Sequence, residues 1–99
     1  GPIIMVGMGG IYTEVFKDVQ LGVDDISNAD IRDMIEKLKI YPILKGARGK
    51  RGYNLKILDK IISGVARMAQ KRRDIHELDI NPVILKGDKA IALDARIVI

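Results

Sequence analysis

The segment 75–99 constrains the fold more strongly than any other part of this sequence. Two runs rich in β-forming residues flank Gly87 and Asp88, a pair suited to a two-residue hairpin turn that needs positive φ. If these residues form the turn, counting outward fixes which residue of one strand faces which residue of the other. The pairs nearest the turn are then Lys86 with Lys89, Leu85 with Ala90, Ile84 with Ile91, and Val83 with Ala92.

The same count brings polar side chains together farther from the turn. It places Asn81 opposite Asp94. On the same face, two residues farther along, Asp79 lies opposite Arg96. Directly opposed residues have Cβ atoms about 4.5–5.5 Å apart, although a one-residue slip would undo the pairing. An amide and a carboxylate at that distance suit Mg²⁺, which takes oxygen ligands and commonly accepts only one or two from protein. The alternative is a solvated polar face with an ordinary Asp79–Arg96 pair.

The start of the chain carries a second hairpin signal, a Gly9-Gly10 pair between two apolar runs. A turn at that pair sets Met5 opposite Glu14. The opening run has no polar side chain, which predicts a strand buried on both faces and a chain that is a piece of something larger. Glu14 is the only charged residue before position 17. It either ends a strand in water or faces a functional site.

Two amphipathic helices are predicted between the hairpins. The Ser27 side chain can cap the first helix, and Asp30, three residues later, can complete a reciprocal capping box with it. Pro42 ends the helix. The apolar positions of this helix follow helical spacing: Ile31, Met34, Ile35 and Leu38. The second helix runs from about Asn54, a good cap, to about Arg72.

The element order predicts an α+β fold, with one antiparallel sheet and both helices on one face. A chain of 99 residues is expected to form a single domain, 1–99. Within the second helix, we expect Gly64 to allow close packing against a neighbour. We expect Met68 to fill the core.

The segment 45–52 is a glycine-rich basic loop with four cations and no acid. Such a loop can present backbone N–H groups and charges to a phosphate, or it can be a solvated connector. It lacks the ending of a P-loop. A nucleic-acid-binding domain is an alternative that would use its cations, Lys45, Arg48, Lys50 and Arg51. The net charge of +4 tolerates anionic ligands but gives little support to that alternative, so nucleic acid is not the expected partner.

The composition excludes several classes of site. Without cysteine, there is no disulfide, thiolate zinc site or cysteine nucleophile. No apolar run approaches the ~20 residues of a membrane span, so we expect no membrane partner and a cytoplasmic location. His76 is the only histidine, and its place at the entrance of a strand favours a structural or exposed residue over a catalytic one. No catalytic side chain is predicted.

Several segments together resemble one known family. They are GPIIMVGMGGIYTEVFKDV, YPILKGARG, HELDINPVI and ALDARI. The chain resembles the ATP-grasp region of ADP-forming acyl-CoA synthetases, the acetate–CoA ligase (ADP-forming) group, which is related to the β subunit of succinyl-CoA synthetase. The likeness spans essentially all 99 residues. It implies the C-terminal lobe of an ATP-grasp domain.

The resemblance assigns roles to specific positions. The INP asparagine and the LD aspartate, here Asn81 and Asp94, would hold Mg²⁺. Asp79 would hold Asn81 in position without binding the metal itself, and Arg96 would lie beside it in the same supporting role. Glu14 would point toward the nucleotide. The family's phosphoryl-carrying histidine lies on another domain or subunit. The sequence departs from the family after KDV, where Gly22 stands near the position of a family arginine.

The resemblance also implies a reaction and partners. Acyl-CoA, ADP and phosphate would give the free acid, CoA and ATP. Mg²⁺ and ATP or ADP would be the cofactors. An N-terminal ATP-grasp lobe and a CoA-binding subunit or domain would complete the enzyme, and the 99 residues alone would be inactive. An assembly or regulatory module without catalysis is the competing interpretation.

Overall fold

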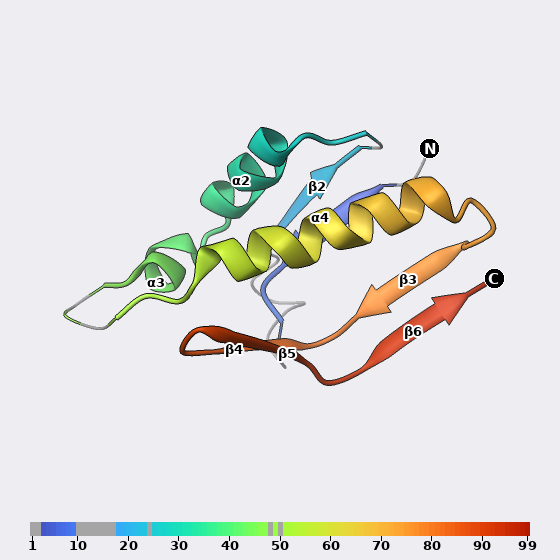
Figure 1. Cartoon of the computed structure of the whole chain (residues 1–99). Helices are drawn as coiled ribbons and strands as arrows, with labels where there is room; N and C mark the ends of the chain where they lie inside the picture. The colour runs from blue at the N-terminus through green and yellow to red at the C-terminus, as the bar shows by residue number, and fades with distance from the viewer. Residues whose placement is uncertain (1–2, 10–17, 24, 48, 50) are drawn as a thin grey trace.

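The computed structural model describes residues 3–9, 18–23, 25–47, 49 and 51–99 (Figure 1). Its elements, in chain order, are β1 (Ile4–Gly7), β2 (Val19–Gly22), α2 (Asn28–Lys37), α3 (Tyr41–Lys45), α4 (Leu55–Lys71), β3 (Glu77–Ile80), β4 (Val83–Lys86), β5 (Lys89–Ala92) and β6 (Ala95–Val98).

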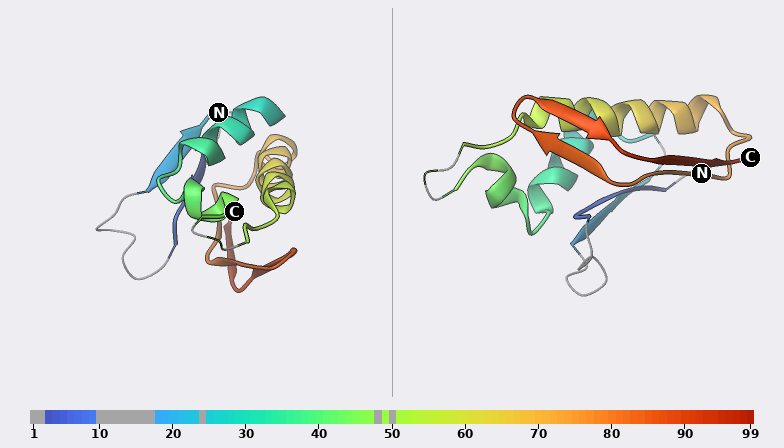
Figure 2. Two further views of the ribbon diagram at one scale, coloured as in Figure 1. Left: turned by 90° about the vertical axis from the view of Figure 1, so that its left-hand side faces the viewer. Right: turned by 90° about the horizontal axis from the view of Figure 1, so that it is seen from below.

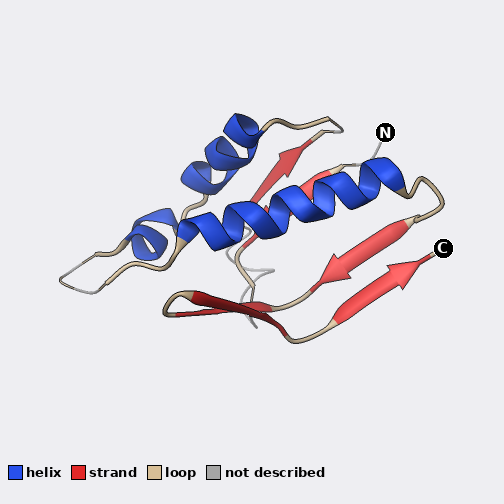
Figure 3. Cartoon of the chain, in the orientation of Figure 1, coloured by secondary structure: helices blue, strands red, loops and turns tan. Residues whose placement is uncertain are grey.

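The strands pair antiparallel, as β1 with β2, β3 with β6, and β4 with β5. The predicted α+β class is therefore confirmed. The prediction of one continuous sheet is wrong for the described strands, because they form three separate two-stranded ladders. Figures 1 and 2 show α4 between α2 and the C-terminal strands. Figure 3 shows the helices grouped on one side of the strands from β3 to β6.

The core lies where β1, α2 and α4 meet. Its buried side chains are Ile4 from β1, Ile31, Met34 and Ile35 from α2, and Ile62 and Ala66 from α4. Ile31 and Ile35 are each only 2% exposed. The predicted apolar stripe of the first helix is thus the part of the chain that water reaches least. Burying side chains of this size stabilises a fold by about 1.5–3 kcal/mol each.

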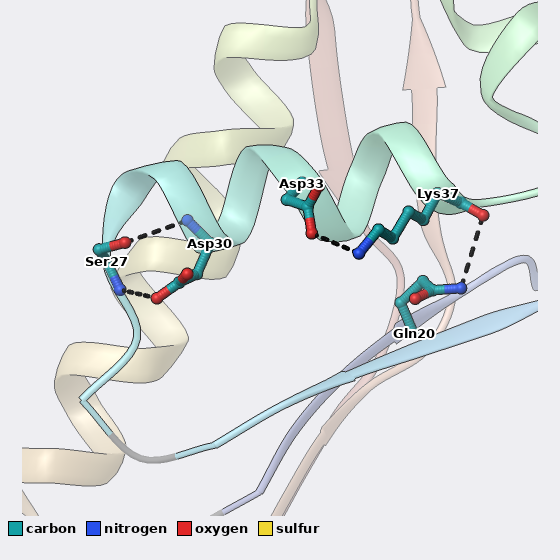
Figure 4. Close-up of polar contacts among 5 residues, drawn as sticks. All are labelled: Gln20, Ser27, Asp30, Asp33 and Lys37. Carbon is teal, nitrogen blue, oxygen red and sulfur yellow. Dashed lines mark hydrogen bonds and ion pairs between the residues drawn. The ribbon is translucent and has the colours of Figure 1, made fainter.

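Helix α2 begins with the predicted capping box (Figure 4). The Ser27 hydroxyl accepts a hydrogen bond from the Asp30 N–H at 3.1 Å, and the Asp30 carboxylate accepts one from the Ser27 N–H at 2.9 Å. The Ser27 N–H lowers the pKa of Asp30 below its ordinary value. Farther along α2, Lys37 pairs with Asp33 at 2.8 Å.

The end of the first helix differs from the prediction. Helix α2 ends at Lys37, and Leu38 follows in an extended conformation. Pro42 does not terminate it; it lies in the first turn of α3, a short helix that was not predicted. Proline is tolerated there because the first N–H groups of a helix have no partner within it.

Helix α4 confirms the predicted bounds but not two packing roles. The Asn54 side chain accepts a hydrogen bond from the Lys56 N–H at 3.1 Å, and Arg72 ends the helix. Met68 is 42% exposed, so its prediction as core is wrong. Nothing lies within 4 Å of a Cβ built at Gly64, so this glycine packs against no neighbour.

Strand β1 is buried on one face only. Ile4 is 6% exposed, but Met5 beside it is 67% exposed, so within these 99 residues the predicted burial on both faces is not found. Met5 lies opposite Leu21 of β2. The predicted partner, Glu14, falls outside the described residues.

Strand β2 packs closely on α2. A Cβ at Gly22 would lie 2.8 Å from the Met34 sulfur and 3.2 Å from Ile26 Cγ2. This crowding accounts for the glycine at position 22. No helix in the described part of the chain is long and apolar enough to cross a bilayer.

Candidate functional site

The register predicted for the C-terminal strands is confirmed. The four pairs around the Gly87-Asp88 turn occur as predicted, and Gly87 adopts φ of 59°. Beyond them, Asp79 lies opposite Arg96 in the β3–β6 pair. The turn therefore sets the pairing of strands on both sides of the junction between the two ladders.

The predicted Asn81–Asp94 pairing falls at that junction. The Asn81 N–H donates to the Asp94 carbonyl at 3.1 Å, and the Leu93 N–H donates to the Pro82 carbonyl at 3.1 Å. The Asn81–Pro82 peptide bond is cis. The two residues are thus held side by side by main-chain hydrogen bonds, between the end of one ladder and the start of the next.

Both side chains at the junction are exposed. One Asp94 carboxylate oxygen, Oδ1, accepts the Ala95 N–H at 2.9 Å, which steadies the carboxylate from one side. The other Asp94 carboxylate oxygen and the Asn81 amide oxygen are metal ligands of the type that Mg²⁺ prefers. These oxygens fit a partly filled magnesium site whose remaining ligands are water or phosphate. Among the described residues, no three acidic, cysteine or histidine side chains gather to make a fuller metal site.

Gly9 also reaches this junction, which the sequence did not predict. A Cβ built on Gly9 would lie 4.0 Å from the Asn81 amide oxygen and 3.9 Å from Pro82 Cβ. The backbone that follows β1 therefore passes beside the amide. The only sequence signal was a glycine, the residue that leaves a backbone most approachable.

Asp79 and Arg96 oppose each other without forming an ion pair. The strands align their Cα atoms, and both side chains are exposed. Ion pairs do occur elsewhere in the described part of the chain, for example between Arg32 and Asp59, Lys37 and Asp33, and Arg72 and Asp74. The structure therefore gives Asp79 and Arg96 the predicted position without a salt bridge between them.

Two other candidates lie apart from this pair. Glu14 falls outside the described residues, so its predicted role stays a prediction. His76 is exposed at the start of β3, and its N–H donates to the Val98 carbonyl at 2.7 Å. That bond extends the β3–β6 ladder, as expected of a structural residue.

Asp18 is a buried acid that the sequence did not single out. It is only 3% exposed. Its carboxylate accepts the backbone N–H groups of Lys39 and Ile40, the latter at 2.9 Å, and its carbonyl accepts the Met8 N–H at 2.8 Å. Asp18 thus ties the segment after α2 to the chain just before Gly9.

The glycine-rich loop 45–52 is closed at its base by main-chain contacts. The Tyr53 N–H donates to the Leu44 carbonyl at 2.8 Å. A Cβ at Gly52 would overlap the Lys45 carbonyl group. Because the backbones touch, position 52 has no room for a side chain. The phosphate-binding role of this loop stays a prediction.

Comparison with known proteins places these features in a family. The ATP-grasp domain family matches residues 1–99. The β subunit of acetate–CoA ligase (ADP-forming) I from Pyrococcus furiosus is 44% identical over the whole chain, which spans 43% of that relative. The 4-hydroxybutyrate–CoA ligase (ADP-forming) from Nitrosopumilus maritimus is 38% identical over 98% of the chain, which spans 14% of it.

A solved structure agrees with the sequence comparisons. The acetyl-CoA synthetase 1 of Candidatus Korarchaeum cryptofilum, in complex with coenzyme A and Mg-AMPPCP, superposes with a TM-score of 0.92 at 34% identity. The match covers 99% of this chain and 46% of that one. The chain thus spans less than half of the relatives it matches, and it belongs to the ATP-grasp domain family.

Proposed function

We propose that residues 1–99 are the C-terminal lobe of the ATP-grasp domain of an ADP-forming acyl-CoA synthetase, in which they bind Mg²⁺ and the nucleotide's phosphates. The observation that carries the proposal is the hydrogen-bonded pairing of Asn81 with Asp94 at the ladder junction. Two exposed oxygen ligands, held by two neighbouring strands, provide part of a Mg²⁺ coordination sphere that phosphates and water can complete.

The reaction is the conversion of acyl-CoA, ADP and phosphate to the free acid, CoA and ATP. Phosphoryl transfer relies mainly on positioning and charge stabilisation. Mg²⁺, when bound, would neutralise charge on the phosphate oxygens. Asn81 and Asp94 would supply two of its ligands. Asp79 and Arg96, two residues away on the same strands, would help to orient those ligands.

The relatives support this assignment. The Korarchaeum synthetase structure holds Mg-AMPPCP, an analogue in which magnesium accompanies a nucleotide. The Pyrococcus relative is named as a subunit of an ADP-forming ligase. The chain spans only part of each relative, so partners complete the enzyme in this proposal. They are the N-terminal ATP-grasp lobe and a CoA-binding subunit or domain. The 99 residues alone do not turn over acyl-CoA.

The test replaces both ligands in the full-length protein that contains these residues. Removing a residue that only supports a metal ligand typically weakens metal affinity by about 10–100-fold. Because Asn81→Ala with Asp94→Ala removes the ligands themselves, we expect it to weaken Mg²⁺-dependent ADP binding by more than that. Isothermal titration with and without Mg²⁺ measures this, and acyl-CoA turnover gives the activity. Size-exclusion chromatography checks that assembly survives.

A matched control separates ligand loss from general damage. Asn28→Ala with Asp33→Ala removes the same two side-chain types at exposed positions on α2, away from the ladder junction. We expect it to bind ADP and magnesium like the wild type. Unchanged binding and turnover in the Asn81/Asp94 variant would overturn the proposal and favour an assembly module. Turnover of acetyl-CoA by residues 1–99 without any other protein would refute the need for partners.

A further inference from the structure

The outward face of the β1–β2 pair is entirely apolar. Met5 and Leu21 lie directly opposite each other and are 67% and 64% exposed. The residues at either side of this pair on the same face are also exposed and apolar: Ile3, Val19 and Val23. We call these five residues the β1–β2 patch. Adjacent large apolar side chains that remain in water mark an interaction surface rather than ordinary exposure.

The strands beneath the patch already use their other face. Ile4 is a member of the core and Val6 packs against it. Side chains alternate between the faces of a strand, so the patch points away from α2 and α4. A strand that is apolar on both faces is characteristic of the inside of a protein, with a layer on each side. Among the described residues, α2 and α4 supply a layer on one side only.

The described C-terminal strands also expose large apolar side chains, but charged residues lie among them. Leu93 is 62% exposed and Ile97 is 52% exposed, and Asp94 and Arg96 lie next to them in the chain. Ile84 and Ile91 also face each other in the open, but the next pair on their face is Lys86 with Lys89. Those lysines keep that face compatible with water. The β1–β2 patch contains no charged or polar side chain. Permanent interfaces have this composition, whereas transient ones are more polar.

We propose that the β1–β2 patch is the docking surface for the part of the same polypeptide that residues 1–99 do not span. The chain covers 43% of its Pyrococcus relative and 46% of the Korarchaeum structure. More than half of each relative therefore lies outside the matched region and can supply the missing layer. The proposal rests on the part of the proposed function that gives this chain a partner lobe. It does not depend on metal binding at Asn81 and Asp94.

The methionines provide a direct test in the full-length protein. Met5 is 67% exposed, Met68 is 42% exposed and Met34 is 6% exposed when the described residues stand alone. Peroxide oxidises a thioether to a sulfoxide in proportion to its access to solvent. If the patch is covered, Met5 will react more slowly than Met68 and at a rate close to that of Met34. Peptide mass spectrometry after timed exposure to hydrogen peroxide measures all three in one sample.

The outcomes separate the possible occupants. Oxidation of Met5 faster than Met68 would overturn the proposal. Protection that appears only as protein concentration rises would overturn it by assigning the patch to a second copy. Protection that requires a separately encoded subunit would overturn it in the same way. Magnesium-dependent ADP binding, measured on the same preparation, reports separately on the proposed function.

A charge substitution gives a second readout. Leu21→Lys places an ammonium group in the patch, and Ile43→Lys places one at a site of almost equal exposure on α3, 64% against 62%. If the patch is buried in the full-length protein, Leu21→Lys will lower Tm by about 5 °C or more, because an unpaired charge becomes buried. Ile43→Lys will leave Tm nearly unchanged. Equal effects of the two variants would contradict the proposal.

Discussion

The two strand systems of this molecule each leave one face uncovered, and the chemistry of those faces differs. The β1–β2 pair shows water the side chains of Met5 and Leu21, with no polar group among the neighbours on that face. The C-terminal strands show water the amide of Asn81 and the carboxylate of Asp94. Covering an apolar face with protein lowers the free energy, because apolar surface leaves water. A face with exposed oxygen atoms is instead stabilised when an ion or water binds to those atoms.

The comparison explains why the same fold can serve two kinds of recognition. Both strand pairs are antiparallel and short, so their backbones do not distinguish them. The distinction lies in which side chains alternate outward. In our proposals the β1–β2 pair binds polypeptide, whereas the C-terminal strands bind a small charged ligand at Asn81 and Asp94, although they also expose Leu93 and Ile97.

The strongest way to sharpen this contrast is to truncate neighbouring residues on opposite faces of β1. Ile4→Ala removes a core side chain that is 6% exposed, and we expect it to lower the free energy of unfolding by about 2–5 kcal/mol. Met5→Ala would cost little if its side chain stayed in water. In the full-length protein, with the patch covered, we expect it to cost about 2 kcal/mol or more. Urea titration measures both.

A smaller effect is expected at Asp18, which joins the chain before β2 to the segment after α2. Asp18→Asn keeps the shape but turns one acceptor into a donor that faces a backbone N–H, at a cost of about 1.5–3 kcal/mol. Faster hydrogen exchange at the amides of Lys39 and Ile40 would report it. Asp33→Asn, which removes only an exposed pair with Lys37, is the control and is expected to cost about 0.3–0.5 kcal/mol. Unaltered exchange at both amides in Asp18→Asn would show that this tie does not hold the segment.

Glycine substitutions test whether the turn sets the C-terminal register. Gly87 has φ of 59°, where a side chain costs about 1 kcal/mol or more, so Gly87→Ala should destabilise the protein by about that amount. Gly64→Ala should stabilise it by about 0.5–1 kcal/mol, because Gly64 sits inside α4 with open space around it. Thermal unfolding would show opposite shifts in Tm. Shifts of the same sign would contradict the assignment.

The mildest effect concerns acid. The Ser27 N–H holds the pKa of Asp30 below its ordinary value of 3.8. A lowered pKa means that the interaction stabilises α2 above the unfolded pKa and is lost as pH falls through the folded pKa. Asp30→Asn should therefore flatten the loss of stability below about pH 4. Carboxyl NMR titration of Asp30 checks the direction, and a pKa above 3.8 would contradict it.

The sequence predicted the C-terminal register for a clear physical reason. At Gly87-Asp88 a tight turn joins strands that are adjacent in sequence, so local conformation determines the pairing. The pairing of Met5 with Leu21 was not foreseen, because no short turn joins β1 to β2, and the predicted Met5–Glu14 pairing stays a prediction. The helix that follows Asn54 was predicted well because its capping residue and its stripe of apolar residues both indicate a helix over the same segment. Pro42 misled the prediction because proline both ends helices and begins them.

The candidate site was predictable in the same uneven way. Asn81 and Asp94 share a hairpin, so counting brought them together. The approach of Gly9 and the tie made by Asp18 depend on contacts between segments far apart in the chain. Nothing in a hydrophobic pattern indicates that an aspartate will be buried against two backbone amides. Such positions emerge only when the elements are packed in three dimensions.

The pinched base at Gly52 has a consequence for variation among proteins of this kind. The two ends of the segment 45–52 meet where the Tyr53 N–H donates to the Leu44 carbonyl. Each doubling of the length between these ends would add about 0.6 kcal/mol to the entropic cost of closing the loop. Added length is therefore a small change in stability, whereas a side chain at position 52 would overlap the Lys45 carbonyl group.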